Sequence, residues 1–306
     1  MTITVGLAGI TGKFGRLLAS KLLQKPDVLL RGYCRDPKKV IAPIASSSQV
    51  QLFQGEAYDD DKIRSFVKGC DVVVCAYLGD GKLMVDGQKK LIDGCEAEAV
   101  PRFVASDWSL DYTKLELGEF FAKEPMQHVK AHLEAQKNVK GVHILIGAFM
   151  EVIFGPFFQA FDPASKTFKY WGDGTEAWEG TTYENAAEYT AAIVTDPSAT
   201  GIQKFVGDRK NVNEIAATFQ KVYGVEPKLE RQGSFEDLKA KMYSVRAENP
   251  SEWYKYLPMF YTYYWGISRT NVGSDFDNTK YPGVKPFTWE DFMRTRSIEQ
   301  LSGGVN

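Results

Sequence analysis

Cysteine is scarce in this chain of 306 residues, and so is histidine. The four cysteines, Cys34, Cys70, Cys75 and Cys95, do not show the spacing of a metal site, and only three histidines are present. We interpret the cysteines as buried or free thiols in a reducing compartment. This composition argues against a disulfide framework, and no metal site is predicted.

Charge of one sign is not in excess either, and long apolar runs are missing. The formal net charge is −2, so nothing favours nucleic acid or an anionic membrane surface as a partner. The least polar segment, residues 142–161, is interrupted by Glu151, Gly155 and Pro156, which is typical of a buried strand leading into a loop and not of a membrane span. The N-terminus lacks a basic region followed by an apolar stretch, so no secretory signal is expected. We therefore predict a cytoplasmic protein.

The chain does have enough apolar residues for a large core. Hydrophobic residues make up 44% of it, and its length suits one unit with two lobes. Up to about residue 150, apolar runs alternate with helical patterns, which predicts a parallel sheet covered on both faces. The predicted fold is α/β, with a Rossmann-type doubly wound parallel sheet in residues 1–150 that residues 183–206 rejoin. A smaller C-terminal α/β substrate lobe is expected in residues 151–182 and 207–306.

A glycine-rich stretch lies near the N-terminus, in the sequence VGLAGITGKFGRLL of residues 5–18. Apolar residues before it predict a buried strand, and leucines at helical spacing after it predict a helix. In such a strand–turn–helix unit, glycines form the tight turn, let the backbone approach a pyrophosphate and let the helix pack on the sheet. The phosphates then bind at the amide end of the helix. We predict cofactor contacts at Gly9, Thr11, Gly12, Lys13, Phe14 and Gly15.

The end of the second predicted strand, residues 28–34, indicates which dinucleotide binds. In this fold an acidic residue at that position holds the ribose hydroxyls of NAD, whereas an arginine accommodates the 2′-phosphate of NADP. This strand is followed by Arg35, with Lys39 one turn further. A guanidinium group suits a phosphate better than a carboxylate does. The predicted cofactor is therefore NADP(H).

Further candidates follow from the place where doubly wound sheets bind ligands, outside the carboxyl ends of the strands. The fourth predicted strand ends near Ala76 and Tyr77, where we expect the backbone to pass the adenosine ribose. The fifth ends at Ser106, whose hydroxyl is suited to contact nicotinamide or polarise a carbonyl group, although it caps the next turn equally well. Tyr112 lies a few residues further and is a candidate acid catalyst.

The C-terminal half is rich in aromatic residues, above all in the sequence WYKYLPMFYTYYW of residues 253–265. Ligand pockets are lined mainly by such side chains, so this stretch is a candidate wall of a site for a flat organic substrate. The core of an α-rich lobe, or a contact between subunits, explains the same pattern.

Several segments carry a resemblance to a known family. GITGKFG matches the GxTGxxG turn of atypical short-chain dehydrogenases, and CRDPKK matches their NADP-selecting loop. PRFVASDWSLD resembles a segment of isoflavone reductase and NmrA-like proteins, and HILIGAFMEVIFG, TTYENAAEYTAAIVTDP and YPGVKPFTWEDF are similar to later segments of fungal isoflavone reductase-like members. The resemblance covers nearly the whole chain. It implies a Rossmann lobe, a C-terminal substrate lobe, NADP(H), and reduction of an aromatic or secondary-metabolite-like compound.

The sequence departs from this family at the catalytic position. The family's reductases carry a lysine early in the helix after the fifth strand, and one alignment puts Met126 or Pro125 there, with Lys130 at the place of the short-chain dehydrogenase lysine. A rival alignment puts Lys130 at the family's lysine itself. We predict that Lys130 holds the nicotinamide ribose and assists proton transfer. His128 is a further candidate proton donor, and its i, i+4 partner His132 makes no metal site with it because no third ligand is evident.

Two functions of different classes follow. In the first, the protein is an NADPH-dependent oxidoreductase that reduces a C=O, C=N or activated C=C bond of an aromatic small molecule. In the second, it is an NmrA-like sensor that binds NADP(H) without turnover and reports redox state to a regulatory protein partner. The missing family lysine favours the sensor, whereas Lys130 and the aromatic stretch favour the enzyme, which we prefer. A redox-neutral isomerase or cyclase is a third alternative, and a homodimer stays open.

Overall fold

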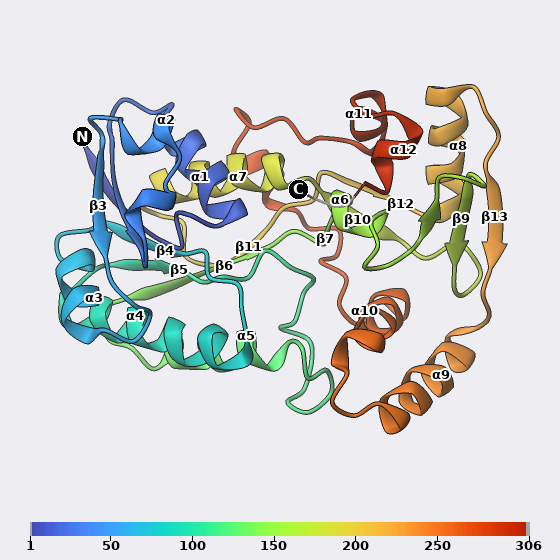
Figure 1. The fold of residues 1–306 in the computed structure, drawn as a ribbon, viewed down its shortest axis with the longest axis horizontal. Coiled ribbons are helices and arrows are strands. Elements are labelled where there is room, and N and C mark those ends of the chain that lie inside the picture. The colour runs from blue at the N-terminus through green and yellow to red at the C-terminus, as the bar shows by residue number, and fades with distance from the viewer. Residues whose placement is uncertain (1, 304–306) are drawn as a thin grey trace. The chain divides into compact units, whose positions relative to one another are not determined.

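The structure is a computed structural model that describes residues 2–303, and the chain folds into two compact units (Figure 1). The first unit comprises the residues up to Trp108, together with Lys123–Leu145 and Ala186–Gln203. The second comprises Ser109–Ala122, Ile146–Asn185 and the residues from Lys204 onward. The two units are similar in length, whereas the sequence predicted a smaller C-terminal lobe.

The centre of the first unit is a seven-stranded sheet, built from β1 (Ile3–Ala8), β2 (Val28–Cys34), β3 (Val50–Gln54), β4 (Val72–Cys75), β5 (Arg102–Val104), β6 (Lys140–Leu145) and β11 (Gly201–Lys204). The strand order is β11-β6-β5-β4-β1-β2-β3. The neighbours β1–β2, β2–β3, β1–β4, β4–β5 and β5–β6 all pair in parallel. The predicted doubly wound Rossmann sheet is confirmed.

Helices cover both faces of this sheet. The helices of this unit are α1 (Lys13–Leu22), α2 (Ala42–Ala45), α3 (Asp60–Val67), α4 (Gln88–Ala97), α5 (Glu124–Glu134) and α7 (Tyr183–Thr195). Two short helical segments, η1 (Pro37–Lys39) and η2 (Leu83–Gly87), accompany them. Figure 1 shows α3, α4 and α5 on one face, and α1 and α7 on the other. On the first face, Phe66, Ile92 and Leu133 of the three helices pack against Val73 and Phe103 in one buried core. Cover on both faces explains why the strands are apolar throughout.

Helix α7 joins the first unit through buried hydrogen bonds at its C-terminal end. The Arg102 guanidinium, only 4% exposed, donates to the carbonyl oxygens of Ile193, Val194 and Asp196 at 3.2, 2.8 and 2.7 Å. Ile193 and Val194 belong to the last turn of α7, and Asp196 directly follows it. One arginine at the start of β5 therefore ties a helix that is distant in sequence to the sheet.

The second unit contains two small sheets. One consists of β7 (Ala148–Phe149), β10 (Trp178–Thr181) and β12 (Asp208–Lys210), and the other of β8 (Phe161–Asp162), β9 (Thr167–Tyr170) and β13 (Lys228–Arg231). Its helices are α6 (Met150–Ile153), α8 (Val212–Tyr223), α9 (Phe235–Glu248), α10 (Leu257–Gly266), α11 (Trp289–Arg294) and α12 (Ile298–Leu301), with the turns η3 (Trp253–Lys255) and η4 (Asp277–Lys280). Phe154, Phe168, Phe219 and Trp289 lie in its apolar core. Among residues 2–303, no helix is both long and apolar enough to cross a membrane.

The unit boundaries differ from the expected ones. Residues 109–122 and 146–150 belong to the second unit, although the sequence analysis assigned all of 1–150 to the nucleotide-binding lobe. The reason is hydrogen bonding between distant segments. The amide of Ile146 donates to Ser109 O at 3.0 Å, and the amide of Asp111 donates to Thr270 O at 2.9 Å. Because these hydrogen bonds join backbone groups, they cannot be predicted from a pattern of side chains.

Candidate functional site

The glycine-rich turn between β1 and α1 is shaped by close backbone approaches. Gly9 has a φ of +84°, and a Cβ atom on it would lie 2.7 Å from Ala76 O. A Cβ atom on Gly15 would lie 2.2 Å from Gly9 O. The left-handed φ and both short distances exclude any side chain at these positions. Gly9 and Gly15 are therefore required by the packing of the turn on β4 and of the helix on the turn.

Gly12 is less tightly enclosed than Gly9 and Gly15. It is exposed, has a φ of −71°, and a Cβ atom on it would meet Gly9 O at 3.2 Å. It is the N-cap residue of α1, and it provides no side-chain cap. The first turn of α1 contains no acidic residue. The amide end of the helix thus keeps its positive partial charge, which fits an anionic group such as a pyrophosphate.

The other residues predicted at this turn surround the start of α1. Lys13 is its first residue, and the Phe14 ring packs against the Trp108 ring with 4.2 Å between the centroids. The Thr11 carbonyl accepts a hydrogen bond from Arg16 Nη1 at 3.2 Å. These contacts hold the turn in place. Their predicted roles in binding the cofactor stay predictions.

Arg35 and Lys39 both lie at the carboxyl end of β2, as the sequence order requires. Both are exposed, and within residues 2–303 neither side chain forms an ion pair or hydrogen bond. The neighbouring Asp36 is engaged locally, because its Oδ1 accepts the amide of Lys38 at 3.1 Å. The two cations are therefore available to a phosphate group. Whether they bind one stays a prediction.

The carboxyl ends of β4 and β5 are fastened together by Ser106. Its hydroxyl donates to Tyr77 O at 2.7 Å, and its amide donates to Gln88 Oε1 at 2.9 Å. Gln88 is only 1% exposed, and its amide group donates in turn to Met84 O at 2.7 Å. Burial raises the pKa of the Tyr77 hydroxyl, so this phenol is neutral. Sequence reasoning missed Gln88, because it lies on a helix face like any other polar residue and only the fold directs it under Ser106.

The start of α5 holds a second residue that sequence reasoning missed. Lys123 is the N-cap residue of this helix, and only 1% of its surface is exposed. Met126, which one alignment puts at the family's lysine, lies one turn further along. Lys130 lies in the turn after that, where its ammonium is paired with the Glu134 carboxylate. A lysine does stand at the beginning of this helix, and it is Lys123.

The remaining catalytic candidates belong to different segments of the chain. His128 is exposed on α5, whereas His132 Nε2 is 2.7 Å from Asp93 Oδ1. Tyr112 is fully buried within the second unit. In the part of the chain that the structure describes, no three His, Cys, Asp or Glu side chains are grouped to hold a metal ion. Catalytic roles for Lys130, His128 and Tyr112 stay predictions.

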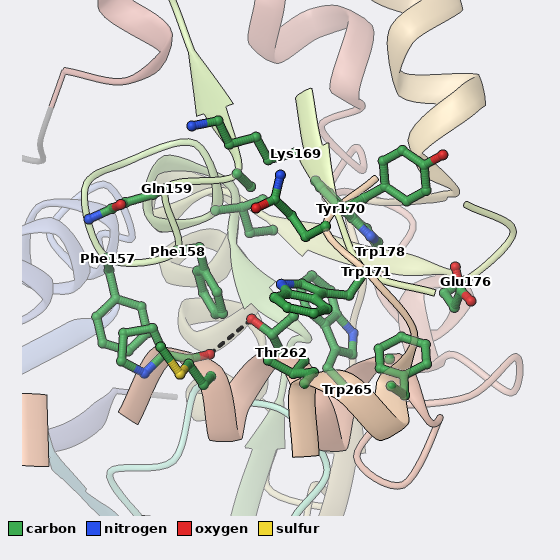
Figure 2. A pocket seen from close by; sticks show the side chains of 18 of the residues that line it. Phe157, Phe158, Gln159, Lys169, Tyr170, Trp171, Glu176, Trp178, Thr262 and Trp265 are labelled. Carbon is green, nitrogen blue, oxygen red and sulfur yellow. Dashed lines mark hydrogen bonds between the residues drawn. The ribbon is translucent and has the colours of Figure 1, made fainter. Parts of the chain in front are cut away.

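The aromatic stretch around α10 has two faces. On one face, Phe260 and Tyr264 pack on the Phe120 ring, with centroids 6.0 and 5.1 Å away. On the other, Thr262 and Trp265 line a cavity of about 510 Å³ within the second unit (Figure 2). The stretch therefore contributes to the core and also lines a cavity, and its role as the wall of a substrate site stays a prediction.

Comparisons with known proteins agree with this geometry. A family model described as NAD(P)H-binding matches residues 9–143. Eugenol synthase 1 of Petunia hybrida is 25% identical over 72% of this chain and 74% of its own, and the isoflavone reductase of Glycine max is 25% identical over 63% and 65%. A crystal structure of an isoflavone reductase superposes with a TM-score of 0.80 at 19% identity, covering 96% of this chain and 99% of that chain. AtPrR2 with NADP+ and (+)pinoresinol superposes with a TM-score of 0.76 at 19% identity, covering 96% and 99%.

The matched region begins at Gly9, in the turn before α1, and ends at His143, in β6. It therefore contains the glycine turn, the carboxyl end of β2 and the Ser106 contacts. Over residues 9–143 the chain is thus similar to NAD(P)H-binding proteins, over most of its length it is similar in sequence to eugenol synthase 1 and isoflavone reductase, and it shares the fold of an isoflavone reductase.

Proposed function

We propose that this protein is an NADPH-dependent reductase that acts on an aromatic small molecule. The observation that carries the proposal is the uncapped amino end of α1 behind Gly12, with the unpaired cations Arg35 and Lys39 at the end of β2. The first feature suits a pyrophosphate, and the second suits the extra phosphate of NADPH. When bound, the cofactor supplies a hydride. The relatives named above, which include reductases of aromatic compounds, support the same substrate class.

The residues that would hold the cofactor follow from these features. The amides at the start of α1 would bind the pyrophosphate, and Arg35 with Lys39 would bind the 2′-phosphate. The backbone at Ala76 and Tyr77 would follow the ribose, and Ser106 would contact the nicotinamide end. The Ser106 hydroxyl donates its proton to Tyr77 O, so its role toward a ligand would be that of a hydrogen-bond acceptor.

Lys123 is our proposed proton donor. Its ammonium group is withdrawn from bulk solvent at the start of α5, where a positive charge stabilises a developing oxyanion more strongly than it does in water. Lys130 is the second candidate, because its side chain is more exposed to water than that of Lys123 and forms an ion pair with Glu134.

The sensor is the second candidate function. It is favoured by Met126, which cannot exchange a proton, at a position where one alignment expects the family's lysine. A sensor requires NADP(H) binding without turnover and a regulatory protein partner.

Turnover measurements separate the two candidates. We expect the purified protein to oxidise NADPH with at least one member of a panel of aromatic ketones, enones and imines. Lys123→Met should lower turnover by about 10²-fold or more, the usual contribution of a general acid. Lys130→Met is the matched control and should retain most of the activity.

Because Lys123 is buried, the NADPH dissociation constant of each variant shows whether it is folded. No turnover by the wild type with any substrate, together with nucleotide-dependent capture of one protein partner, would establish the sensor. Loss of turnover in Lys130→Met but not in Lys123→Met would reverse our assignment of the two lysines.

A further inference from the structure

The second unit contains a ligand-sized cavity that is separate from the nucleotide-binding residues. Its volume is about 510 Å³, within the range of small-molecule sites. It lies among β9, α9, α10 and the segment that follows α6, and every residue that lines it belongs to the second unit. Figure 2 shows aromatic side chains from these elements gathered around it.

The walls of this cavity are flat and aromatic. Trp171, Trp178 and Trp265 line it together with Phe157 and Phe158. The Trp265 ring centroid is 6.2 Å from that of Trp178 and 6.1 Å from that of Phe158. Rings at such distances form a rigid surface that suits an aromatic ligand, because offset stacking stabilises ring pairs beyond the burial of their area.

The Phe235 ring of α9 also lines the cavity. The ring has room there because residue 266 on the next helix is a glycine. A Cβ atom on Gly266 of α10 would lie 2.1 Å from the Phe235 ring. Gly266 therefore lets α9 place this ring against α10 and beside the cavity.

The polar groups of the lining are mostly hydrogen-bond donors. Lys169 and Lys241 make no ion pair within residues 2–303, and Lys241 Nζ lies 5.7 Å from the centroid of the Trp171 ring. The Trp265 side chain is 6% exposed, and its indole N–H has no acceptor among the described residues. A buried donor without an acceptor is costly, and an acceptor on a ligand would remove that cost.

The lining also contains one acidic side chain, Glu176, which the backbone holds in place. Both carboxylate oxygens of Glu176 accept backbone amides, those of Asp173 and Gly174, at 2.9 Å each. A third lining cation, Lys255, is paired with Glu252 at 2.8 Å. The cavity therefore combines aromatic walls with two ammonium groups that form no ion pair within residues 2–303, one carboxylate, and one N–H group without an acceptor among these residues.

We propose that this cavity binds a flat aromatic carboxylate, with the ring between the tryptophans and the carboxylate near Lys169 and Lys241. Carboxylate oxygens accept hydrogen bonds and donate none, which matches a donor-rich lining. The ammonium next to the Trp171 ring adds attraction for an anion that lies against that ring. Binding does not depend on the proposed reductase activity, since no nucleotide-binding residue lines the cavity.

Calorimetric titration of the full-length protein without nucleotide tests this proposal. The probe is 2-naphthoate, compared with 2-naphthamide, which has the same rings without the charge, and with cyclohexanecarboxylate, which has the charge without the rings. We expect saturable 1:1 binding of 2-naphthoate and at least about tenfold weaker binding of the other two. Equal affinities for the acid and the amide, or no saturable binding of the acid, would overturn the proposal.

Matched variants then locate the site. The double variant Lys169→Met, Lys241→Met should weaken 2-naphthoate binding by about tenfold, given that each partly exposed charge pair contributes up to about fivefold. The control, Lys228→Met with Lys239→Met, removes the same charge at residues outside the lining and should bind like the wild type. If the control variant loses as much affinity for 2-naphthoate as the lining variant, the net charge of the protein attracts the carboxylate, and our proposal for this cavity is wrong. Binding of 2-naphthoate should also survive in Gly12→Val, so a failure of nucleotide binding and a failure of this site are distinguishable.

Discussion

His143 on β6 donates a hydrogen bond from Nδ1 to Oδ2 of Asp107 at 2.8 Å, and both side chains are almost fully buried. Asp107 directly follows Ser106, whose hydroxyl joins the ends of β4 and β5 and whose amide donates to Gln88 of α4. The histidine therefore anchors, from inside the first unit, the segment that we expect to face the cofactor. A buried hydrogen bond of this kind strengthens in the low dielectric of the interior, and an unpaired partner there is costly.

The first prediction follows from this pair. Asp107→Ala leaves the His143 imidazole buried without its acceptor and should lower the free energy of unfolding by about 1 to 3 kcal/mol. Asp107→Asn keeps an acceptor oxygen of the same size and should cost less. Urea denaturation of the three proteins measures both differences. Equal stability of the alanine variant and the wild type would show that the pair contributes nothing to the fold.

The glycine turn provides a second prediction. Gly12→Val should fold, because the φ of −71° suits any residue and Gly9 O, 3.2 Å from a Cβ atom at Gly12, needs to shift by only a few tenths of an ångström, but its branched side chain should block the amide end of α1. We expect far-UV circular dichroism like that of the wild type and no measurable NADPH binding. Gly15→Val is the contrasting variant, since its Cβ atom would lie 2.2 Å from Gly9 O, and it should fail to fold. Full NADPH affinity in Gly12→Val would mean that this turn binds no pyrophosphate.

Cofactor preference is the third prediction. The wild type should bind NADPH more tightly than NADH. Arg35→Ala should weaken NADPH binding by about tenfold to a hundredfold, the effect of losing a hydrogen bond to a charged group of roughly 1.5 to 3 kcal/mol. The NADH affinity of the same variant is the internal control and should change little. Fluorescence titration with NADPH and with NADH measures these affinities. Equal affinities of the wild type for NADPH and NADH would contradict the predicted preference.

The fourth prediction concerns acid stability of the second unit. Arg269 binds both Glu119 oxygens, Nε to Oε1 at 2.8 Å and Nη2 to Oε2 at 3.0 Å, and these hydrogen bonds lower the pKa of the Glu119 carboxyl below its usual value. A pKa that is lower in the folded state than in the unfolded state stabilises the protein above the unfolded pKa of about 4.3. That stabilisation is lost as the pH falls through the folded-state pKa. Glu119→Gln should therefore be less stable than the wild type at pH 7, and the difference should shrink below about pH 4.

Thermal unfolding of both proteins from pH 7 to pH 3 measures this difference. Glu226→Gln, a change in the same unit at an exposed residue whose side chain forms no ion pair or hydrogen bond within residues 2–303, is the control. A difference between Glu119→Gln and the wild type that stays constant over this pH range would show that the ion pair is not its cause.

The order of neighbouring residues in the sequence was sufficient to predict the glycine-rich turn between β1 and α1. Gly9, Gly12 and Gly15 are close neighbours in sequence, and a buried strand before them with a helix after them can meet only through such a turn. Arg35 was predictable for the same reason, because it directly follows a strand whose direction and neighbours the alternating pattern already defines. The predicted Rossmann sheet was confirmed because its strands are continuous apolar runs and its helices have amphipathic spacing.

Only the tertiary structure decided which polar residues are buried and which segments belong together. Lys123, Gln88 and the Asp107–His143 pair look like ordinary surface residues in the sequence, and each is buried by elements distant along the chain. Residues 109–122 join the second unit through backbone hydrogen bonds that no side-chain pattern encodes. Likewise, the aromatic stretch at residues 253–265 became core on one helix face and the wall of a cavity on the other. Periodicity along a chain reports which face of an element is apolar, whereas burial of a particular charge depends on long-range packing that periodicity does not contain.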